Sequence, residues 1–336
     1  MHRGGNLLTL VSITVCARNA ENWVEQCLSS LISQDYRPIE IIAVDDGSSD
    51  GTLEKMLNFR DSKLDHNIEI SVIGSEPLGL SAGRQLALES ANGEWVAITD
   101  IDCRPHPNWI SAMMSAYDKD TSENVAAITG RTIFSEGNTR VSKIRSRTIQ
   151  RKYEQRKRLV TLANGPCSMF RREALLAIGG FNPCWYHAED MEVSLLLIQS
   201  GGSIIYESTA LVQHVAEEGL LLFLRKRCRD ARAHFRIVRK FGFQGVKNPS
   251  GSIMKHDFVS DAEKVVLLLP IFLIGFSMCS LGLVVIPNPY WWGITGLTLI
   301  FVLFSLTKWP HILWSASLWY GGILGLCDAI FRRRGH

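Results

Sequence analysis

Two aspartates, Asp100 and Asp102, stand two residues apart and carry the first sign of chemistry in this sequence. They follow the apolar run that opens "WVAITDIDCRP", residues 95–105. Carboxylates this close repel each other, so a cation or a proton must offset their charge. Their hard oxygens suit Mg²⁺ or Mn²⁺, whose open positions are usually filled by substrate phosphates. The spacing indicates a divalent metal site that takes a phosphate; the alternative is that Asp102 only caps the following turn.

Other ionisable groups occupy comparable positions along the chain. Asp45 and Asp46 end the run "IEIIAVDD" and precede "GSSDG", which by itself would indicate only a turn. Glu189 and Asp190 open "EDMEVSLLLIQSGG", where a helix N-terminus would stabilise a carboxylate; the alternative is a plain acidic cap. His214 ends "SIIYESTALVQH" and taken alone would be a strand-end histidine without a ligand.

The segments that carry these groups alternate between β-branched apolar runs and amphipathic helical patterns. Such alternation predicts an α/β fold, a mainly parallel sheet with helices on both faces. Ligands bind such sheets beyond the carboxyl ends of the strands, which is where both acidic pairs fall. Strands are predicted over 9–17, 39–47, 68–74 and 94–100, and helices over 20–34, after Asp50, and over 80–91.

Four stretches, read together, resemble the family 2 glycosyltransferases with the GT-A fold. These enzymes use nucleotide-diphosphate sugars and invert the anomeric centre. The resemblance covers roughly residues 12–214, in the family's order and at plausible spacing. The stretches are "SITVCARNAENWVEQCLSSLISQDY", "IEIIAVDDGSSDGT", "GLSAGRQLALESANGEWVAITDIDCRPHPNWI" and "NGPCSMFRREALLAIGGFNPCWYHAEDMEVSLLLIQSGGSIIYESTALVQH".

The resemblance implies a role for each matching residue. Asp102 would bind a divalent metal, Mn²⁺ or Mg²⁺, and His214 would complete that metal site. Asp190 would be the base that takes the proton of the acceptor hydroxyl. Asp100 would meet the ribose or the metal, and Arg84 the nucleotide or its phosphates. The residues implied in nucleotide-sugar binding are Ala17, Arg18, Asn19, Asp45, Asp46, Arg84, Asp100 and Glu189.

Departures from the family pattern affect the acceptor side most. Leu196 stands where many members have an arginine, and the "QxxRW" signature of processive synthases is absent from the sequence. We therefore expect one sugar per encounter, moved to a hydroxyl of a lipid-linked glycan or surface polysaccharide. Two alternatives stay open: a polyprenyl-phosphate sugar synthase, and a catalytically inactive scaffold that binds sugar nucleotides. A redox enzyme is not expected, because no GxGxxG follows the first strand.

Two basic segments indicate an anionic partner. Residues 143–158 hold eight Lys/Arg against one Glu, and 221–241 hold eight more Lys/Arg among apolar residues. The second segment predicts an amphipathic helix at the level of lipid headgroups. Arg225, Arg227 and Arg229 are candidates for binding the acceptor or a lipid phosphate; the alternative is a solvated charged helix. Nucleic acid is not expected as a partner.

The C-terminal part is strongly apolar. Residues 265–286 contain no charge and are long enough to cross a bilayer; 290–306 and 312–331 are weaker candidates, with a buried helical hairpin as the alternative. If all three crossed, "FRRRGH" would lie outside, against the positive-inside rule. We expect a GT-A domain over 8–216, a basic interfacial segment over 217–262, and two to three transmembrane helices over 263–331.

The expected location is the cell membrane, as a multi-pass protein with its catalytic domain on the cytoplasmic side. No signal peptide is visible at the start of the sequence. The eight cysteines are scattered and form no CxxC pair, which is typical of a reducing compartment.

Overall fold

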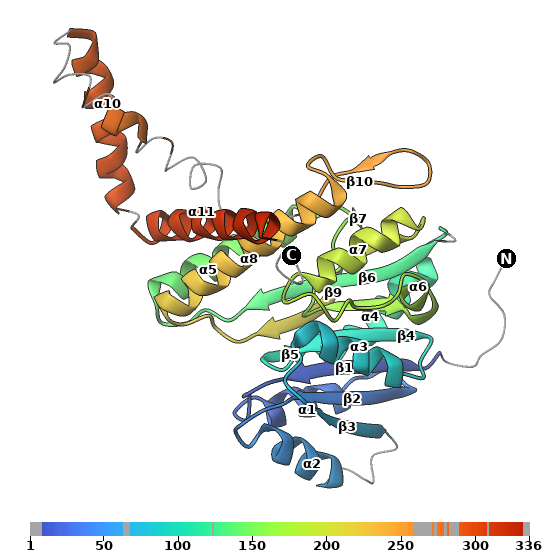
Figure 1. Ribbon diagram of the computed structural model, residues 1–336. Coiled ribbons are helices and arrows are strands. Elements are labelled where there is room, and N and C mark those ends of the chain that lie inside the picture. Colours follow the sequence, from blue (N-terminus) through green and yellow to red (C-terminus); the bar gives the residue numbers. More distant parts are fainter. Residues whose placement is uncertain are drawn as a thin grey trace.

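Four parallel strands form the first half of the central sheet in the computed structural model (Figure 1). They are β1 (Val11–Ala17), β2 (Ile39–Asp46), β3 (Glu69–Ser75) and β4 (Trp95–Asp100), in the order β3-β2-β1-β4. The predicted strands are thus confirmed within two residues at each end. The structure describes residues 9–62, 68–122, 124–257, 271, 274–278, 281, 289–307 and 309–331.

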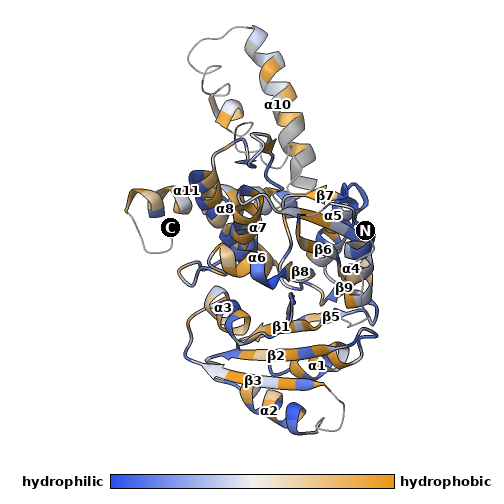
Figure 2. Ribbon diagram, turned by 90° about the vertical axis from the view of Figure 1, so that its right-hand side faces the viewer, coloured by the Kyte–Doolittle hydropathy of each residue, from blue (hydrophilic) through white to orange (hydrophobic). Residues whose placement is uncertain are grey.

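The helices between these strands cover both faces of the sheet, as the strand pattern requires. In β2, Ile41 and Ala43 face the core shared with α1 (Val24–Ile32) and α2 (Thr52–Ser62). The alternate residues of β2 face α3 (Leu80–Ser90) on the other side. Figure 2 shows α1 and α3 on opposite sides of the strands. The strands β1, β2 and β4 are buried on both faces and are therefore mainly apolar, whereas the edge strand β3 is partly exposed.

The second half of the sheet mixes parallel and antiparallel pairs and continues from β4 in the order β8-β6-β9-β5, with β7 paired to β9. The antiparallel pairing of β5 with β9 places Cys103 opposite His214. This long-range pairing brings the aspartate pair to the predicted histidine. The elements are β5 (Cys103–Pro105), α4 (Trp109–Lys119), β6 (Val125–Phe134), α5 (Arg140–Glu154), β7 (Leu159–Val160), β8 (Ser168–Arg171), α6 (Arg172–Ala177), α7 (Glu189–Gln199) and β9 (Ser203–His214).

Two long helices pack against each other above the sheet: α8 (Leu220–Phe241) and α11 (Trp309–Ile330) (Figure 1). Gly321 permits the close approach, because a Cβ there would lie 2.2 Å from the carbonyl oxygen of Cys228. Asp328 is 1% exposed and forms an ion pair with Arg232 of α8. The remaining elements are β10 (Val246–Lys247), β11 (Ile253–Met254) and α10 (Pro289–Thr307).

The predicted transmembrane helices are not confirmed. Among the helices of the described residues, none is both long and apolar enough to cross a membrane. The candidates 290–306 and 312–331 correspond to α10 and α11, and α11 carries a buried carboxylate and packs one side on α8. The candidate 265–286 falls largely outside the described residues.

Candidate active site

A cavity of about 490 Å³ opens at the carboxyl ends of β1 and β4, between α3, α7 and α8. The topology explains its composition, because the strand ends, the start of α7 and one side of α8 all meet there. Of the fourteen predicted site residues, those that line it are Arg18, Arg84, Asp100, Asp102, Glu189, Asp190, His214, Arg227 and Arg229. The described lining does not include Ala17, Asn19, Asp45, Asp46 or Arg225.

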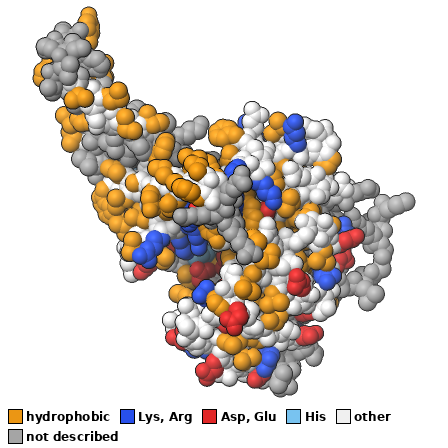
Figure 3. All heavy atoms as spheres, viewed as in Figure 1, with side chains coloured by type: hydrophobic (Ala, Val, Ile, Leu, Met, Phe, Trp, Pro, Cys, Tyr) orange, Lys and Arg blue, Asp and Glu red, His pale blue; other side chains and the backbone are white. Residues whose placement is uncertain are grey.

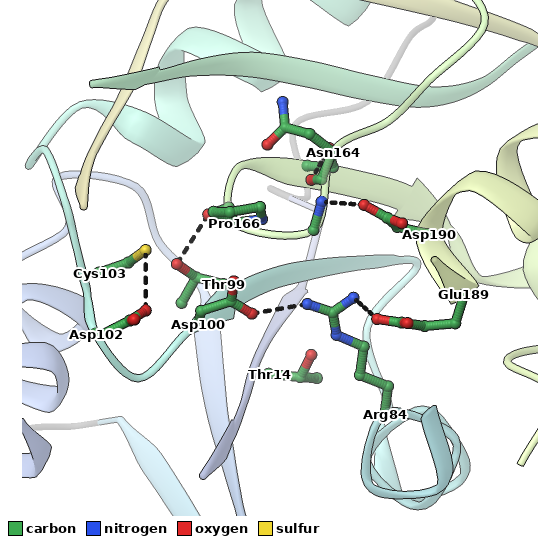
Figure 4. A network of polar contacts seen from close by, with 12 residues as sticks. Thr14, Arg84, Thr99, Asp100, Asp102, Cys103, Asn164, Pro166, Glu189 and Asp190 are labelled. Carbon is green, nitrogen blue, oxygen red and sulfur yellow. Dashed lines mark hydrogen bonds and ion pairs between the residues drawn. The ribbon is translucent and has the colours of Figure 1, made fainter. Parts of the chain in front are cut away.

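Arg84 forms ion pairs with residues of two acidic motifs, Asp100 of the first and Glu189 of the second. Its Nη2 donates to Asp100 Oδ1 at 2.8 Å, and its Nη1 donates to Glu189 Oε1 at 2.5 Å (Figure 4). The guanidinium is only 3% exposed, and burial by itself would lower its pKa; Glu189 and Asp100 outweigh burial and raise it. Sequence reasoning assigned Arg84 to the nucleotide or its phosphates, whereas both of its terminal nitrogens face protein carboxylates.

Replacing Arg84 with methionine is expected to destabilise the fold by about 3–5 kcal/mol, because the buried Glu189 carboxyl would lose its ion-pair partner. Urea unfolding of the purified protein measures the loss. Arg60→Met is the matched control, since Arg60 and Asp61 form a pair of the same 2.8 Å length at 36% and 59% exposure. The control substitution should lower the free energy of unfolding by less than about 1 kcal/mol. Equal midpoints for the two variants would contradict a stabilising role for Arg84.

Asp190 lies at the first turn of α7 and faces the cavity. Its Oδ2 accepts a hydrogen bond from the backbone N–H of Gly165 at 2.8 Å, and Oδ1 accepts from Met191 N–H at 2.8 Å. Burial, with the neighbouring Glu189, raises the pKa of Asp190 to about 6. Ala188, directly before α7, has φ +62°, a left-handed conformation that non-glycine residues adopt at a cost. A carboxylate with a pKa near neutrality, held at a cavity, suits a general base.

Asp102 and His214 form the candidate metal centre. His214 Nε2 lies 3.4 Å from Asp102 Oδ2. His214 Nδ1 lies 2.8 Å from the carbonyl oxygen of Val215, so Nδ1 carries the proton and donates. Nε2 is then the ring nitrogen available to bind a cation. Asp102, Cys103 and His214 offer ligand atoms within 4.8 Å of one another.

The donor set fits a divalent cation that accepts oxygen and imidazole ligands, such as Mn²⁺. Cys103 is the poorest ligand of the three, because burial raises the pKa of its thiol well above the usual value and keeps it protonated. Asp102 and His214 are therefore the residues that would hold the ion. Substrate phosphates would supply further oxygen ligands from the cavity side.

The loop after β2 separates the two aspartates that were predicted together. Asp46 accepts hydrogen bonds from Leu78 N–H and Gly79 N–H, so it holds the loop before α3. Asp45 accepts from Ser48 N–H with Oδ2, while Oδ1 is buried and has no hydrogen-bond partner among the described residues. Asp45 thus has one buried carboxylate oxygen that accepts no hydrogen bond from the described residues, whereas the hydrogen bonds to the Asp46 carboxylate come from the loop before α3.

Asp45→Asn is expected to weaken nucleoside diphosphate binding roughly tenfold, because an amide NH₂ would replace the Oδ1 acceptor while the bond to Ser48 survives. Calorimetric titration with UDP, GDP, CDP and dTDP measures the change. Asp61→Asn, on the exposed end of α2, serves as the control and should bind as the wild type does. Unchanged affinity of the Asp45 variant for every nucleotide would exclude Asp45 from base recognition.

The wall of the cavity opposite the strand ends is basic. Of the three predicted acceptor-binding arginines, Arg227 and Arg229 line it, and Arg225 does not; it is exposed on α8. The reason is helical geometry, since the residues of α8 that face the cavity recur at intervals of three and four. The sequence shows that both segments are basic, but it does not show which of their residues face the cavity. Lining residues it missed include Arg145, His187, Glu217, Lys226, Asp230 and His234.

These features together define an α/β protein with a cavity at the carboxyl ends of its strands, a candidate metal centre and a buried carboxylate whose pKa is raised. Glycosyl transferase family 2 matches residues 12–179, half of the chain. The chain belongs to this family.

Individual glycosyltransferases are also similar to this chain in sequence. An uncharacterised glycosyltransferase of Haemophilus influenzae is 36% identical over 111 residues, 33% of each chain. The UDP-Glc:α-D-GlcNAc-diphosphoundecaprenol β-1,3-glucosyltransferase WfgD of Escherichia coli is 36% identical over 94 residues, 28% of this chain and 35% of its own. The chain thus spans about a third of the length of these relatives.

A solved structure resembles the whole fold. The mannosyltransferase PcManGT of Pyrobaculum calidifontis, in complex with GDP-Man and Mn²⁺, aligns with a TM-score of 0.69 at 20% identity, covering 98% of this chain and 89% of that chain. The predicted GT-A-like α/β fold is confirmed by this likeness.

Proposed function

We propose that this protein moves a sugar from a nucleotide-diphosphate donor to a hydroxyl group of an acceptor, with inversion at the anomeric carbon. The observation that supports this most strongly is the shared cavity. Asp190 lies on one side of it and the Asp102–His214 pair on another, and Arg84 links Asp100 with Glu189 between them. Donor phosphates and acceptor hydroxyl could therefore meet in one place.

Asp190 and the candidate metal centre would contribute to different parts of the reaction. Asp190 would accept the proton of the attacking hydroxyl, since a carboxylate with a pKa near 6 is ionised at neutral pH and basic enough to take it. A divalent cation held by Asp102 and His214 would offset the charge that develops on the leaving diphosphate. The proposed direct displacement forms no covalent enzyme intermediate, so one inversion of configuration is expected.

The acceptor that we favour is a hydroxyl on a sugar attached to a lipid phosphate. The name of WfgD describes a transfer to a diphosphoundecaprenol-linked sugar, and the cationic cavity wall of this chain would suit such a phosphate. The same wall gives some support to a second candidate, a polyprenyl-phosphate sugar synthase. The raised pKa of Asp190 favours the hydroxyl acceptor, because a phosphate oxygen needs no base at neutral pH.

We also propose that the enzyme works on the cytoplasmic side of the cell membrane. Exposed apolar side chains lie along α11, and two more precede the exposed Arg225 on α8. Figure 3 shows apolar side chains gathered over the upper helices, with Lys and Arg side chains below them. The exposed residues are Leu221, Leu222, Trp309, Leu313, Trp319, Tyr320, Ile323, Leu326 and Ile330. Co-flotation with anionic rather than neutral vesicles would support this placement.

The experiment that tests the function is a transfer assay with purified protein, Mn²⁺ and a panel of UDP-, GDP-, CMP- and dTDP-sugars. Lipid-linked sugars serve as acceptors, and nucleotide release is followed together with the mass of the product. Proton NMR of the product reports the configuration of the new bond. Transfer with retained configuration would overturn the proposed mechanism. Nucleotide binding without transfer or nucleotide release would favour the inactive scaffold.

A further inference from the structure

Three cationic side chains converge on one buried carboxylate, Glu217, at the basic wall of the cavity. Lys226 Nζ lies 3.0 Å from Glu217 Oε1, and Arg227 Nη2 lies 4.0 Å from the same oxygen. Arg145 Nε lies 3.5 Å from Glu217 Oε2. Burial by itself would raise the pKa of Glu217, but the three cations lower it to about 2. Glu217 is therefore a fixed negative charge inside a cationic cluster.

The cluster holds more positive than negative charge. Asp230, the next carboxylate, lies 3.1 Å from Arg227 and is shared with His187 at 2.8 Å. Arg227 is 3% exposed, and its Nε and Nη1 are buried without hydrogen-bond partners among the described residues. Burial and the neighbouring Arg227 lower the pKa of Arg145 to about 10. Buried cations in excess of their counterions are a place where a further anion is stabilised.

Aromatic contacts join this cluster to the candidate metal centre. Phe134 stacks on His214 with ring centroids 4.3 Å apart, and the Arg145 guanidinium lies 4.9 Å from the Phe134 ring centroid. Arg145, Lys226 and Arg227 line the same cavity as Asp190. A molecule that offers a hydroxyl to Asp190 could therefore extend a charged group toward them.

We propose that Arg145, Lys226 and Arg227 form an anion subsite for a phosphate group of the acceptor, with Glu217 as the internal carboxylate that this phosphate displaces. The subsite is separate from the metal centre that takes the donor diphosphate. This inference rests on the proposed function and deepens it, because it selects acceptors that carry a phosphate next to the reacting sugar.

The proposed exchange requires the Glu217 side chain to move, and the chain segment that carries it has open space at one position. It joins β9 to α8 and is fastened near the metal centre by Val215 N–H, which donates to the Asp102 carbonyl at 3.1 Å. Gly219 follows with φ +95°, and a Cβ there would meet nothing within 4 Å. A glycine in this conformation with open space around it permits the backbone to rotate. Movement of Glu217 need not disturb Asp102.

The first test is binding of inorganic pyrophosphate in EDTA, followed by thermal shift and calorimetry on the full-length protein. Lys226→Gln is expected to weaken binding roughly tenfold through loss of one charge-assisted contact. Glu217→Gln is expected to strengthen binding by a similar factor, because a competing anion is removed. Arg239→Gln, a change of an exposed cation at the far end of the same helix, is the control and should bind as wild type.

The two substitutions are expected to change the pyrophosphate affinity in opposite directions. This makes the test specific, since loss of a purely structural contact would not raise the affinity in one variant and lower it in the other. Failure of the wild type to bind pyrophosphate would overturn the subsite. Equal affinity in wild type, Lys226→Gln and Glu217→Gln would do the same. Pyrophosphate binding that is lost in Asp102→Ala but kept in Lys226→Gln would assign the anion to the metal centre and also overturn it.

The second test compares paired acceptors that carry the same sugar, one as a lipid diphosphate and one as an uncharged alkyl glycoside. The wild type is expected to show a KM roughly tenfold lower for the diphosphate, and Lys226→Gln should narrow that ratio. Equal KM values for both acceptors would overturn the subsite while leaving the proposed function intact. If neither acceptor is elongated, the result counts against the proposed function. The pyrophosphate titration would still test whether the anion subsite exists.

Discussion

Replacing Asp190 with asparagine is expected to lower the rate of sugar transfer by roughly 10²–10⁴-fold, the usual contribution of a positioned general base. The amide cannot accept the proton of the acceptor hydroxyl. Nucleotide affinity should stay close to that of the wild type, because the base and diphosphate contacts assigned above do not include Asp190. Transfer assays and nucleotide titrations on the same preparations separate the two effects.

The pKa of Asp190 predicts how activity and stability change with pH. Transfer should fall as the pH drops through about 6, because the protonated carboxyl is no longer a base. The folded-state pKa lies above the usual value of 3.8, so folding favours the protonated form, and this contribution is lost as the pH rises through about 6. Asp190→Asn should therefore be at least as stable as the wild type at neutral pH, with the difference shrinking in acid.

Three results would contradict the base assignment. The first is transfer by Asp190→Asn at near wild-type rate with a hydroxyl acceptor. The second is a pH profile that keeps its acidic limb in the variant. Transfer retained only with a bare lipid phosphate would be the third, and it would select the polyprenyl-phosphate synthase instead. Asp118→Asn, an exposed change on α4, is the control and should alter neither rate nor profile.

Removal of the divalent cation, or of its ligand in Asp102→Ala, is expected to have the second large effect. Electrostatic stabilisation of the leaving diphosphate is typically worth roughly 10²–10³ in rate. With nucleoside diphosphate at about 100 Kd, the wild type should gain roughly 2.7 kcal/mol of stability. The Mn²⁺-dependent part of that gain should vanish in Asp102→Ala. Thermal shift with and without EDTA, in parallel with the transfer assay, measures both quantities.

His214→Gln provides a graded comparison for the metal centre. It removes the imidazole that stacks on Phe134 but keeps Asp102, so the expected loss is smaller and should be partly restored at high Mn²⁺. A wild type whose nucleotide binding and transfer are both insensitive to EDTA would rule out the metal role of Asp102 and His214. Asp118→Asn again serves as the unaffected control.

Local sequence patterns were sufficient to predict much of the fold of this molecule. Apolar runs that end in Asp46 and Asp100 identified two parallel strands, because strands buried on both faces must be apolar throughout. The carboxyl ends of such strands lie at one edge of the sheet, which is why the sequence predicted a ligand site there; Asp100 lines the cavity at this edge and Asp46 does not. It could not distinguish Asp45 from Asp46, since the Leu78 and Gly79 N–H groups that engage Asp46 come from another loop.

The sequence alone determined the α/β fold and identified Asp100, Asp102 and Asp190 as candidates, since the fold depends on local residue patterns and the candidates on residue type and on the resemblance to the family. Only the tertiary structure decided that Arg84 joins Asp100 to Glu189, that β5 and β9 bring Asp102 to His214, and that α8 directs Arg227 rather than Arg225 into the cavity. Such contacts join residues as many as 112 positions apart, as with Asp102 and His214. They follow from packing and strand pairing across the whole chain, which no local pattern encodes.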